Sequence, residues 1–247
     1  MSTPALEVID LNKSFGGVPA TQNVSLSVAR GERRLLIGPN GAGKTTLFNQ
    51  IAGDIRPTSG SIRLFGHEVS SLPPHRRAHL GLARTYQIIT LFARDSLRRN
   101  VSLALLGLMR ARWDMLRPIS ARAQMVDEVS RILGLVGLGD QEERLAGTLA
   151  YGEQRRLEIA LALAQKPSLL LLDEPLAGLS AEERASVGAL IASIGRDVTI
   201  VMIEHDMETA LELADSITLL HHGSIVVDGS RDAVLADPRT REVYLGH

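Results

Sequence analysis

A glycine-rich segment, residues 38–45, constrains this chain more than any other part of its sequence. Its residues, Gly-Pro-Asn-Gly-Ala-Gly-Lys-Thr, fit the P-loop pattern G-x-x-x-x-G-K-[ST]. Glycines at these positions let the backbone turn so tightly that successive N–H groups face phosphate oxygens. An apolar run that ends at Ile37 precedes the segment, and we expect a helix from Lys44 to Gly53 whose positive N-terminal end adds to the attraction. The sequence therefore predicts a strand, a phosphate-binding loop and a helix in succession.

The side chains of this loop suggest more specific roles. Lys44 is one of only three lysines in the chain, and its ammonium group is expected to reach the β- and γ-phosphates of a nucleotide. The Thr45 hydroxyl suits a Mg²⁺ ion. The predicted nucleotide-contacting residues of this segment are Gly38, Pro39, Asn40, Gly41, Ala42, Gly43, Lys44, Thr45 and Thr46.

Two carboxylates follow a second apolar run. Leu169–Leu172 predict a strand that is buried on both faces, and Asp173 and Glu174 come directly after it. Ligands bind at the carboxyl ends of such strands, so Asp173 suits Mg²⁺, usually through water. Glu174 suits a general base for an attacking water, an effect worth about 10²–10⁴ in rate. The alternative is an acidic turn without chemistry, which the P-loop makes less attractive.

The remaining pattern indicates an α/β chain with an insert. Short apolar stretches before Ile37, separated by glycine-containing turns, predict strands, and two apolar strands after residue 168 flank a helical stretch, which is typical of a βαβ unit. Between these parts the periodicity is helical. We predict one domain over residues 5–247, with 5–93 and 147–247 as the catalytic core and 94–146 as an inserted α-helical subdomain.

Charge and composition exclude several classes of site. Residues 75–131 hold eleven arginines against four acidic residues, a formal balance of +7 within a chain of net charge −1. This segment is either a solvated helical surface or a docking face for a partner or an anionic membrane. The chain has no cysteine, which excludes disulfides, thiolate nucleophiles and cysteine-ligated metal clusters. No apolar run approaches the roughly 20 residues that span a bilayer, so we expect the chain itself to be soluble.

Single polar residues gain meaning from their order. Gln87 follows Tyr86 after a strand-like run, and His205 stands between Glu204 and Asp206 after another; alone, each is more simply a satisfied polar residue at a strand end. Together with the P-loop, Leu149-Ala150-Tyr151-Gly152-Glu153-Gln154 and Asp173-Glu174, they occur in the order found in the ATPases of ATP-binding cassette (ABC) transporters. The chain resembles that family over nearly its whole length.

The resemblance implies a fold and a set of roles. The fold is a P-loop NTPase cassette with a mainly parallel core sheet, an N-terminal antiparallel β-subdomain and the helical insert. Two such chains sandwich two molecules of MgATP, and Ala150, Tyr151, Gly152 and Glu153 face the nucleotide held by the partner. Phe15 is similar to the aromatic residue that stacks on adenine, although it could instead be a strand-end core residue. Gln87 resembles the residue that senses Mg²⁺ and the attacking water, and His205 the one that contacts the γ-phosphate.

Finer details favour one branch of the family. Four segments resemble the ATPase subunits of bacterial branched-chain amino acid importers: Gly81–Gln87, Tyr151–Ala160, Ile203–Met207 and Val243–Gly246. The ATPase of the lipopolysaccharide exporter shares several of these traits, and a non-transport ABC ATPase is a further alternative. The resemblance implies transmembrane permease subunits, a second ATPase subunit and, indirectly, a substrate-binding protein as partners, at the cytoplasmic face of the inner membrane. Nucleic acid is not expected, since aromatic residues are sparse in the basic segment.

Two residues depart from the family pattern. Ala150 stands where a serine normally donates a hydroxyl to the partner's γ-phosphate, and Ser180 stands where an aspartate or asparagine is usual. The backbone N–H groups of Tyr151 and Gly152 remain, so the loss at Ala150 amounts to one hydrogen bond to a charged group, about 1.5–3 kcal/mol. We hypothesise that this chain assists its partner's nucleotide less than its partner assists its own.

Overall fold

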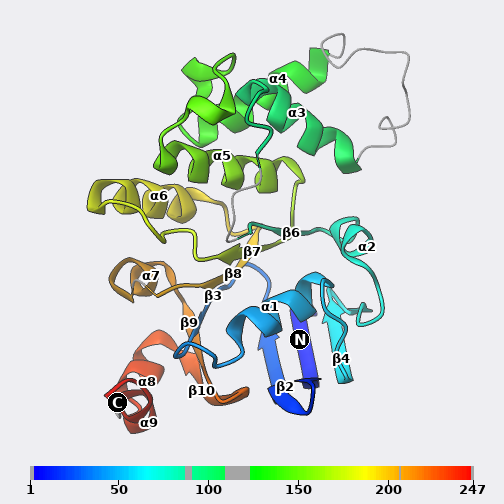
Figure 1. The fold of residues 1–247 in the computed structure, drawn as a ribbon, viewed down its shortest axis with the longest axis vertical. Coiled ribbons are helices and arrows are strands. Elements are labelled where there is room, and N and C mark those ends of the chain that lie inside the picture. The colour runs from blue at the N-terminus through cyan, green and yellow to red at the C-terminus, as the bar shows by residue number, and fades with distance from the viewer. Residues whose placement is uncertain (1–2, 87–90, 109–122, 206, 246–247) are drawn as a thin grey trace.

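The computed structural model describes residues 3–86, 91–108, 123–205 and 207–245. Helices α3, α4 and α5 form one end of the molecule, the sheets and α1 lie in the middle and lower parts, and α8 and α9 form the opposite end (Figure 1). Among the described helices, none has both the length and the apolar character needed to cross a membrane.

The strands are β1 (Leu6–Phe15), β2 (Val18–Val28), β3 (Arg33–Ile37), β4 (Ser59–Leu64), β5 (His67–Glu68), β6 (Leu82–Arg84), β7 (Leu169–Asp173), β8 (Thr199–Ile203), β9 (Ser216–His221) and β10 (Ser224–Ser230). The α-helices are α1 (Lys44–Ala52), α2 (Pro74–Ala78), α3 (Leu97–Leu108), α4 (Ala123–Leu135), α5 (Tyr151–Ala164), α6 (Ala181–Ser193), α7 (Met207–Leu213), α8 (Arg231–Ala236) and α9 (Pro238–Leu245). Short 3₁₀ turns, η3 (Gly139–Gln141) and η4 (Ala146–Thr148), precede α5.

The larger sheet has six strands in the order β10-β9-β3-β8-β7-β6. Its pairs are parallel from β9 through β6, and only β10 runs antiparallel to its neighbour. Every residue of β3, β7 and β8 is buried, because apolar layers cover both faces of the sheet. Leu170 and Leu172 pack into one core cluster, and Leu169 and Leu171 into the other. The structure confirms the predicted α/β class and this doubly buried strand.

The smaller sheet fixes the helix that follows the P-loop. It is antiparallel, in the order β2-β1-β4-β5, and its apolar residues share one cluster with α1 and with the parallel sheet. Leu47, Phe48 and Ile51 of α1 are completely buried in that cluster. The first turn of α1 is therefore held in place by packing along the remainder of the helix.

The helical end of the molecule has its own core. Helices α3, α4 and α5 bury Val101, Val129, Ile132 and Leu157 in a third cluster, and Ala160 and Ala164 of α5 join them. The helical periodicity after Arg94 thus marks helices that pack on one another. Two parts of the basic segment, residues 87–90 and 109–122, lie outside the described residues.

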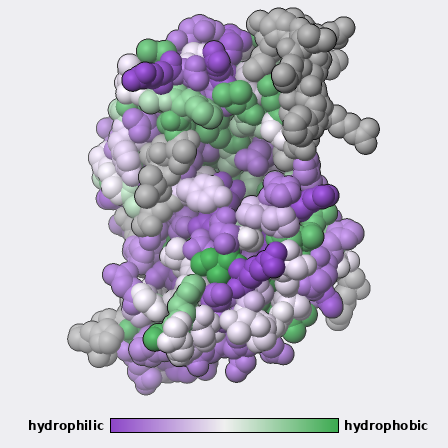
Figure 2. Space-filling model, turned by 45° about the vertical axis from the view of Figure 1, so that its right-hand side comes forward, coloured by the Kyte–Doolittle hydropathy of each residue, from purple (hydrophilic) through white to green (hydrophobic). Residues whose placement is uncertain are grey.

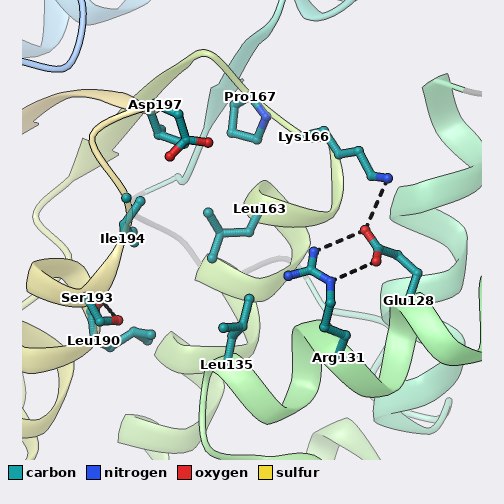
Figure 3. A pocket seen from close by; sticks show the side chains of 12 residues that line it. Glu128, Arg131, Leu135, Leu163, Lys166, Pro167, Leu190, Ser193, Ile194 and Asp197 are labelled. Carbon is teal, nitrogen blue, oxygen red and sulfur yellow. Dashed lines mark hydrogen bonds and ion pairs between the residues drawn. The ribbon is translucent and has the colours of Figure 1, made fainter.

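Glu128 links α4 to the end of α5. Its carboxylate accepts from Arg131 Nε (2.8 Å) and contacts Lys166 Nζ (3.2 Å), which lies in the turn after α5 (Figure 3). The three side chains border a groove of about 540 Å³, whose lining includes Leu163 and Leu190. The hydrogen bond from Arg131, together with the one from Lys166, lowers the pKa of Glu128 from its usual 4.5 to about 2, although burial opposes the shift.

Arg77 is a basic residue that is not solvated. Its side chain is completely buried, and Nη1 donates to the carbonyls of Gln50 (2.6 Å) and Ile51 (2.7 Å) near the end of α1, while Nε donates to Leu72 O (2.9 Å). The last carbonyls of a helix need donors from outside it, and Arg77 supplies them. Burial lowers the pKa of this guanidinium to about 10. For this arginine the solvated-surface interpretation is wrong.

Replacing Arg77 with methionine should destabilise the fold strongly. Arg77→Met keeps the length and the apolar stem but leaves the carbonyls at the end of α1 buried without their donor. We expect a loss of about 3 kcal/mol in the free energy of unfolding, measured by urea denaturation. Arg76→Met, one residue earlier and exposed, is the control and should stay within about 0.5 kcal/mol of wild type. Equal effects from both variants would contradict the capping role.

Glu128→Gln should show a stability loss that depends on pH. A carboxylate whose pKa is lowered on folding stabilises the native state above its usual pKa, and this stabilisation disappears as the pH falls through the folded-state value. We expect a loss of about 1 kcal/mol at pH 7 that shrinks below pH 4.5 and vanishes near pH 2. Urea titrations across this range test it, with Asp127→Asn on an exposed position of α4 as control. A loss that does not change with pH would exclude the ionised pair as its cause.

Candidate functional site

The P-loop joins β3 to α1 in a conformation that only glycine accommodates. A Cβ atom on Gly38 would lie 2.1 Å from Leu220 O, and one on Gly43 would lie 2.3 Å from Ala20 O. Gly43 is also the N-cap of α1 and has a φ of 102°. These glycines therefore hold the loop against β9 and β2. The β1–β2 hairpin, which carries Phe15 at the end of β1, thus reaches the phosphate loop through Ala20.

Lys44 is folded back onto this loop. Its ammonium group is buried and donates to Gly38 O (2.6 Å) and Pro39 O (3.0 Å). Burial lowers the pKa of Lys44, and the carboxylates of Glu174 and Asp173 oppose part of that effect. The ammonium group of Lys44 therefore interacts electrostatically with both carboxylates at the end of β7.

The loop fits a bound phosphate. Gly41 has open space where a Cβ would be, and Asn40, Gly41 and Thr45 are exposed, so an anion can approach the loop from outside. The N–H groups in the first turn of α1 have no carbonyl one turn earlier to bind. Free N–H groups, a positive helix end and a buried ammonium together suit a polyphosphate. The Thr45 hydroxyl and the Asp173 carboxylate are hard oxygen donors, which suit Mg²⁺ held jointly with phosphate oxygens.

Asp173, Glu174 and His205 meet at the carboxyl edge of the parallel sheet. Asp173 ends β7 opposite Ile203 of β8 and is nearly completely buried. The Glu174 N–H donates to Ile203 O (3.0 Å), and Glu174 has a left-handed φ of 50°. Such a φ costs a non-glycine residue about 1 kcal/mol, and here it occurs directly after the last residue of β7. His205 Nε2 lies 3.0 Å from Glu174 Oε1.

Glu204 is a functional candidate that the sequence did not single out. Its side chain is buried, Oε1 accepts from Leu176 N (2.6 Å) and Oε2 accepts from His205 N (3.1 Å). One carboxylate therefore ties the loop after Glu174 to the loop that carries His205. The only sequence signal was an acidic residue directly after a mainly apolar strand, and that signal does not reveal which N–H groups it binds.

Arg84 is the second residue that sequence analysis missed. It ends β6, and its Nη2 donates to Asp173 Oδ2 at 2.8 Å. The guanidinium is almost fully buried, so this arginine, like Arg77, does not belong to a solvated surface. In the sequence it was one of eleven arginines in the basic segment, with nothing to distinguish it from the others.

The predicted adenine-stacking residue, Phe15, lies at the exposed end of β1. Phe15 is 48% exposed, and Lys13 Nζ lies 5.1 Å from its ring centroid. Gln87 lies outside the described residues, so its predicted role stays a prediction.

Residues 150–153 begin α5, far from α1 in the fold (Figure 1). Ala150 has no side-chain oxygen to cap the helix, and Glu153 instead accepts from the Ala150 N–H (2.8 Å). A Cβ on Gly152 would lie 2.6 Å from Glu183 Oε1, so α6 packs closely on this end of α5. Ser180 caps α6: its hydroxyl accepts from Glu183 N (3.3 Å), and Glu183 accepts from Ser180 N (2.9 Å). The departure at Ser180 therefore has a local structural role.

Comparisons with known proteins agree on a single family. The profile of the family described as ABC transporter matches residues 21–177. The high-affinity branched-chain amino acid transport ATP-binding protein BraF of Pseudomonas aeruginosa is 39% identical over 100% of this chain and 99% of its own length. The LivG protein of Salmonella typhimurium, which carries the same description, is 37% identical over the same shares. A crystal structure of an ABC transporter ATP-binding cassette in its ADP conformation has a TM-score of 0.86 at 27% identity, with 99% of both chains covered.

Proposed function

Because the chain belongs to the ABC transporter family, we propose that it is the ATP-hydrolysing subunit of an importer for branched-chain or other hydrophobic amino acids. The identity to BraF and LivG along the whole chain supports this cargo over lipopolysaccharide export and over a non-transport role. The observation that carries hydrolysis is the contact between Glu174 and His205 beside the P-loop lysine.

The proposed reaction assigns one task to each of these groups. Water attacks the γ-phosphorus of ATP, the bond to the oxygen of ADP breaks, and Glu174 accepts the proton that the water loses. His205 holds the Glu174 carboxylate through the 3.0 Å contact. In the proposed reaction His205 would also contact the γ-phosphate. Lys44 neutralises charge on the β- and γ-phosphates, since its ammonium group is already aimed into the loop. Glu204 keeps the His205 and Glu174 loops at a fixed separation.

Mg²⁺ is the expected metal of this site. Thr45 and Asp173 would hold it, with Gln87 as a further ligand, and the ion would neutralise phosphate charge. Phe15 is proposed to stack on adenine, and residues 38–46 are proposed to make the other contacts to the nucleotide bound by this chain. Residues 150–153 would contact the nucleotide bound by a second chain, and Ala150, Tyr151 and Glu153 are exposed or half-buried.

We propose that residues 94–146 act as a helical lobe on the core made by 5–93 and 147–247. Helices α3 and α4 of this lobe pack on α5 of the core in a hydrophobic cluster that is separate from the two clusters covering the sheets, and this supports the proposal. In the described structure α5 also binds the end of β6, because Glu158 Oε1 accepts from Tyr86 N (2.9 Å). A movement of the lobe that shifts α5 would therefore also shift the backbone of Tyr86, directly before Gln87.

A permease is the proposed membrane partner, and it would place the chain at the cytoplasmic face of the inner membrane. Exposed apolar side chains flank the undescribed residues 87–90: Tyr86 is 47% exposed and Phe92 is 60% exposed. Tyr86 and Phe92 support docking of a membrane subunit beside residues 87–90. Figure 2 also shows apolar surface on the upper part of the molecule. A substrate-binding protein would act through that permease, and a second ATPase subunit would complete the nucleotide sites.

Glu174→Gln should separate nucleotide binding from hydrolysis. The amide keeps the size of the carboxylate but cannot accept the proton, so we expect unchanged ATP affinity, at least about 100-fold slower hydrolysis and a stable ATP-bound dimer. Phosphate release and size-exclusion chromatography measure these properties. Glu182→Gln, at an exposed position in α6, is the control and should hydrolyse ATP normally. Undiminished turnover by Glu174→Gln would refute the proposed base.

Ala150→Ser should strengthen the contact to the partner's nucleotide. A hydroxyl at this position restores one hydrogen bond to a charged phosphate, about 1.5–3 kcal/mol, and also caps α5. We expect ATP turnover by the assembled transporter to rise several-fold. Ala181→Ser, at the exposed start of α6, adds a hydroxyl away from that contact and should not change the rate. If Ala150→Ser raises only the melting temperature, the catalytic part of the hypothesis fails.

A further inference from the structure

Arg84 makes two sets of contacts at once. On one side, Nη2 donates to Oδ2 of Asp173 (2.8 Å). On the other, Nη1 donates to Asn49 Oδ1 (2.7 Å) and to Asp54 Oδ2 (2.9 Å). Asn49 belongs to α1, and Asp54 follows the end of that helix. A single rigid guanidinium therefore bridges β7 and the P-loop helix.

The surroundings fix the guanidinium in place. Its carbon lies 5.8 Å from the ring centroid of Phe48 and 5.0 Å from that of Tyr86, so aromatic side chains pack close to it. The side chain is only 7% exposed. Its Nε is buried and has no hydrogen-bond partner within the described residues, so the position of Arg84 is decided by its two terminal nitrogens.

The contact leaves one oxygen of Asp173 available. Asp173 is buried, and a buried carboxylate is unfavourable without a cation. Arg84 provides that cation on Oδ2, and in the described part of the chain no donor is recorded on Oδ1. The Asp173 N–H is held separately by Thr85 Oγ1 (3.2 Å), which fixes the backbone of the same residue.

The helix geometry links this bridge to the second proposed metal ligand. Thr45 and Asn49 are four residues apart in α1, so their side chains lie on the same face of the helix, one turn apart. An arginine that joins Asn49 to Asp173 therefore also sets the separation between Thr45 and Asp173. That separation determines whether both oxygens can serve a single small ion, which demands near-ideal octahedral geometry.

We propose that Arg84 is a positioning residue for the metal site: it holds Asp173 by Oδ2, leaves Oδ1 for Mg²⁺ and ties this carboxylate to the helix that carries Thr45. The proposal rests on the proposed function, which assigns Mg²⁺ to Thr45 and Asp173. Arg84 itself touches neither phosphate nor metal in this scheme. Arg84 should therefore affect only the increase in nucleotide affinity that the metal provides. Replacing Arg84 should leave nucleotide binding without metal unchanged.

Nucleotide affinity with and without metal tests the proposal. A fluorescent, non-hydrolysable ATP analogue is titrated into the full chain in EDTA and then in Mn²⁺, and the ratio of the two dissociation constants gives the metal contribution. We expect Arg84→Met to keep the EDTA affinity within about twofold and to reduce the ratio at least tenfold, with weaker Mn²⁺ binding by electron paramagnetic resonance. Arg131→Met removes an arginine that is also paired with a glutamate but lies in α4, and it should leave the ratio unchanged.

Two more variants separate a bridge from a simple charge. Arg84→Lys keeps the positive charge, but one ammonium group cannot replace two guanidinium nitrogens that point to different elements, so the ratio should remain several-fold below wild type. Asn49→Ala keeps the charge on Asp173 and cuts the link to α1, and it should also lower the ratio several-fold. A wild-type ratio in Arg84→Lys or in Asn49→Ala would overturn the bridge. Circular dichroism shows which variants are folded, and Asn49→Ala decides the matter if Arg84→Met is not.

Asp173→Asn distinguishes the failure of this proposal from the failure of its premise. If Asp173→Asn abolishes the metal contribution and Arg84→Met retains it, the metal assignment stands and the positioning role of Arg84 is wrong. If Asp173→Asn retains the full contribution, Asp173 is not a metal ligand, and the positioning proposal falls with it.

Discussion

The lateral packing of three completely buried strands, β3, β7 and β8, is the constraint on which the other parts of this structure depend. Because these strands are parallel and in register, their carboxyl ends meet at one edge of the sheet, and the P-loop, Asp173 and the loop to His205 begin there. Burial on both faces removes alternative positions for the strands. The site residues are thus brought together by the sheet, although Lys44 and Asp173 lie more than a hundred residues apart in the sequence.

Charged groups at this edge are stabilised by one another. Asp173 ends β7, Glu174 follows it, Glu204 follows β8, and Lys44 begins α1. Lys44, Asp173 and Glu204 are buried, where an isolated charge would be costly. Each has a defined partner: backbone carbonyls for Lys44, Arg84 for Asp173, His205 for Glu174, and backbone N–H groups for Glu204. The charged side chains proposed for catalysis therefore also need partners for the fold to be stable.

Buried charged groups are paired in the same way in α5, the core helix on which the helical lobe packs. Glu158 of α5 is buried, which raises its pKa, and it binds the backbone of Tyr86 and the Arg155 guanidinium (3.0 Å). Tyr86 in turn lies against Arg84. Arg155 also donates to the Tyr151 hydroxyl (3.0 Å) at the start of α5, where the partner's nucleotide is proposed to bind. This end of α5 and the carboxylate proposed for Mg²⁺ are therefore connected through Glu158, Tyr86 and Arg84.

The sequence by itself determined the P-loop, the helix that follows it and the doubly buried strand before Asp173 and Glu174, because local spacing and hydrophobic pattern specify these features. It also predicted an α/β fold with a helical segment, which the structure confirms. Local patterns did not separate Arg77 and Arg84 from their exposed neighbours, nor did they give Glu204 a partner. Only the tertiary structure decided these roles, since burial and hydrogen-bond partners come from residues that are distant in the chain: Arg84 meets Asp173 only because β6 pairs with β7.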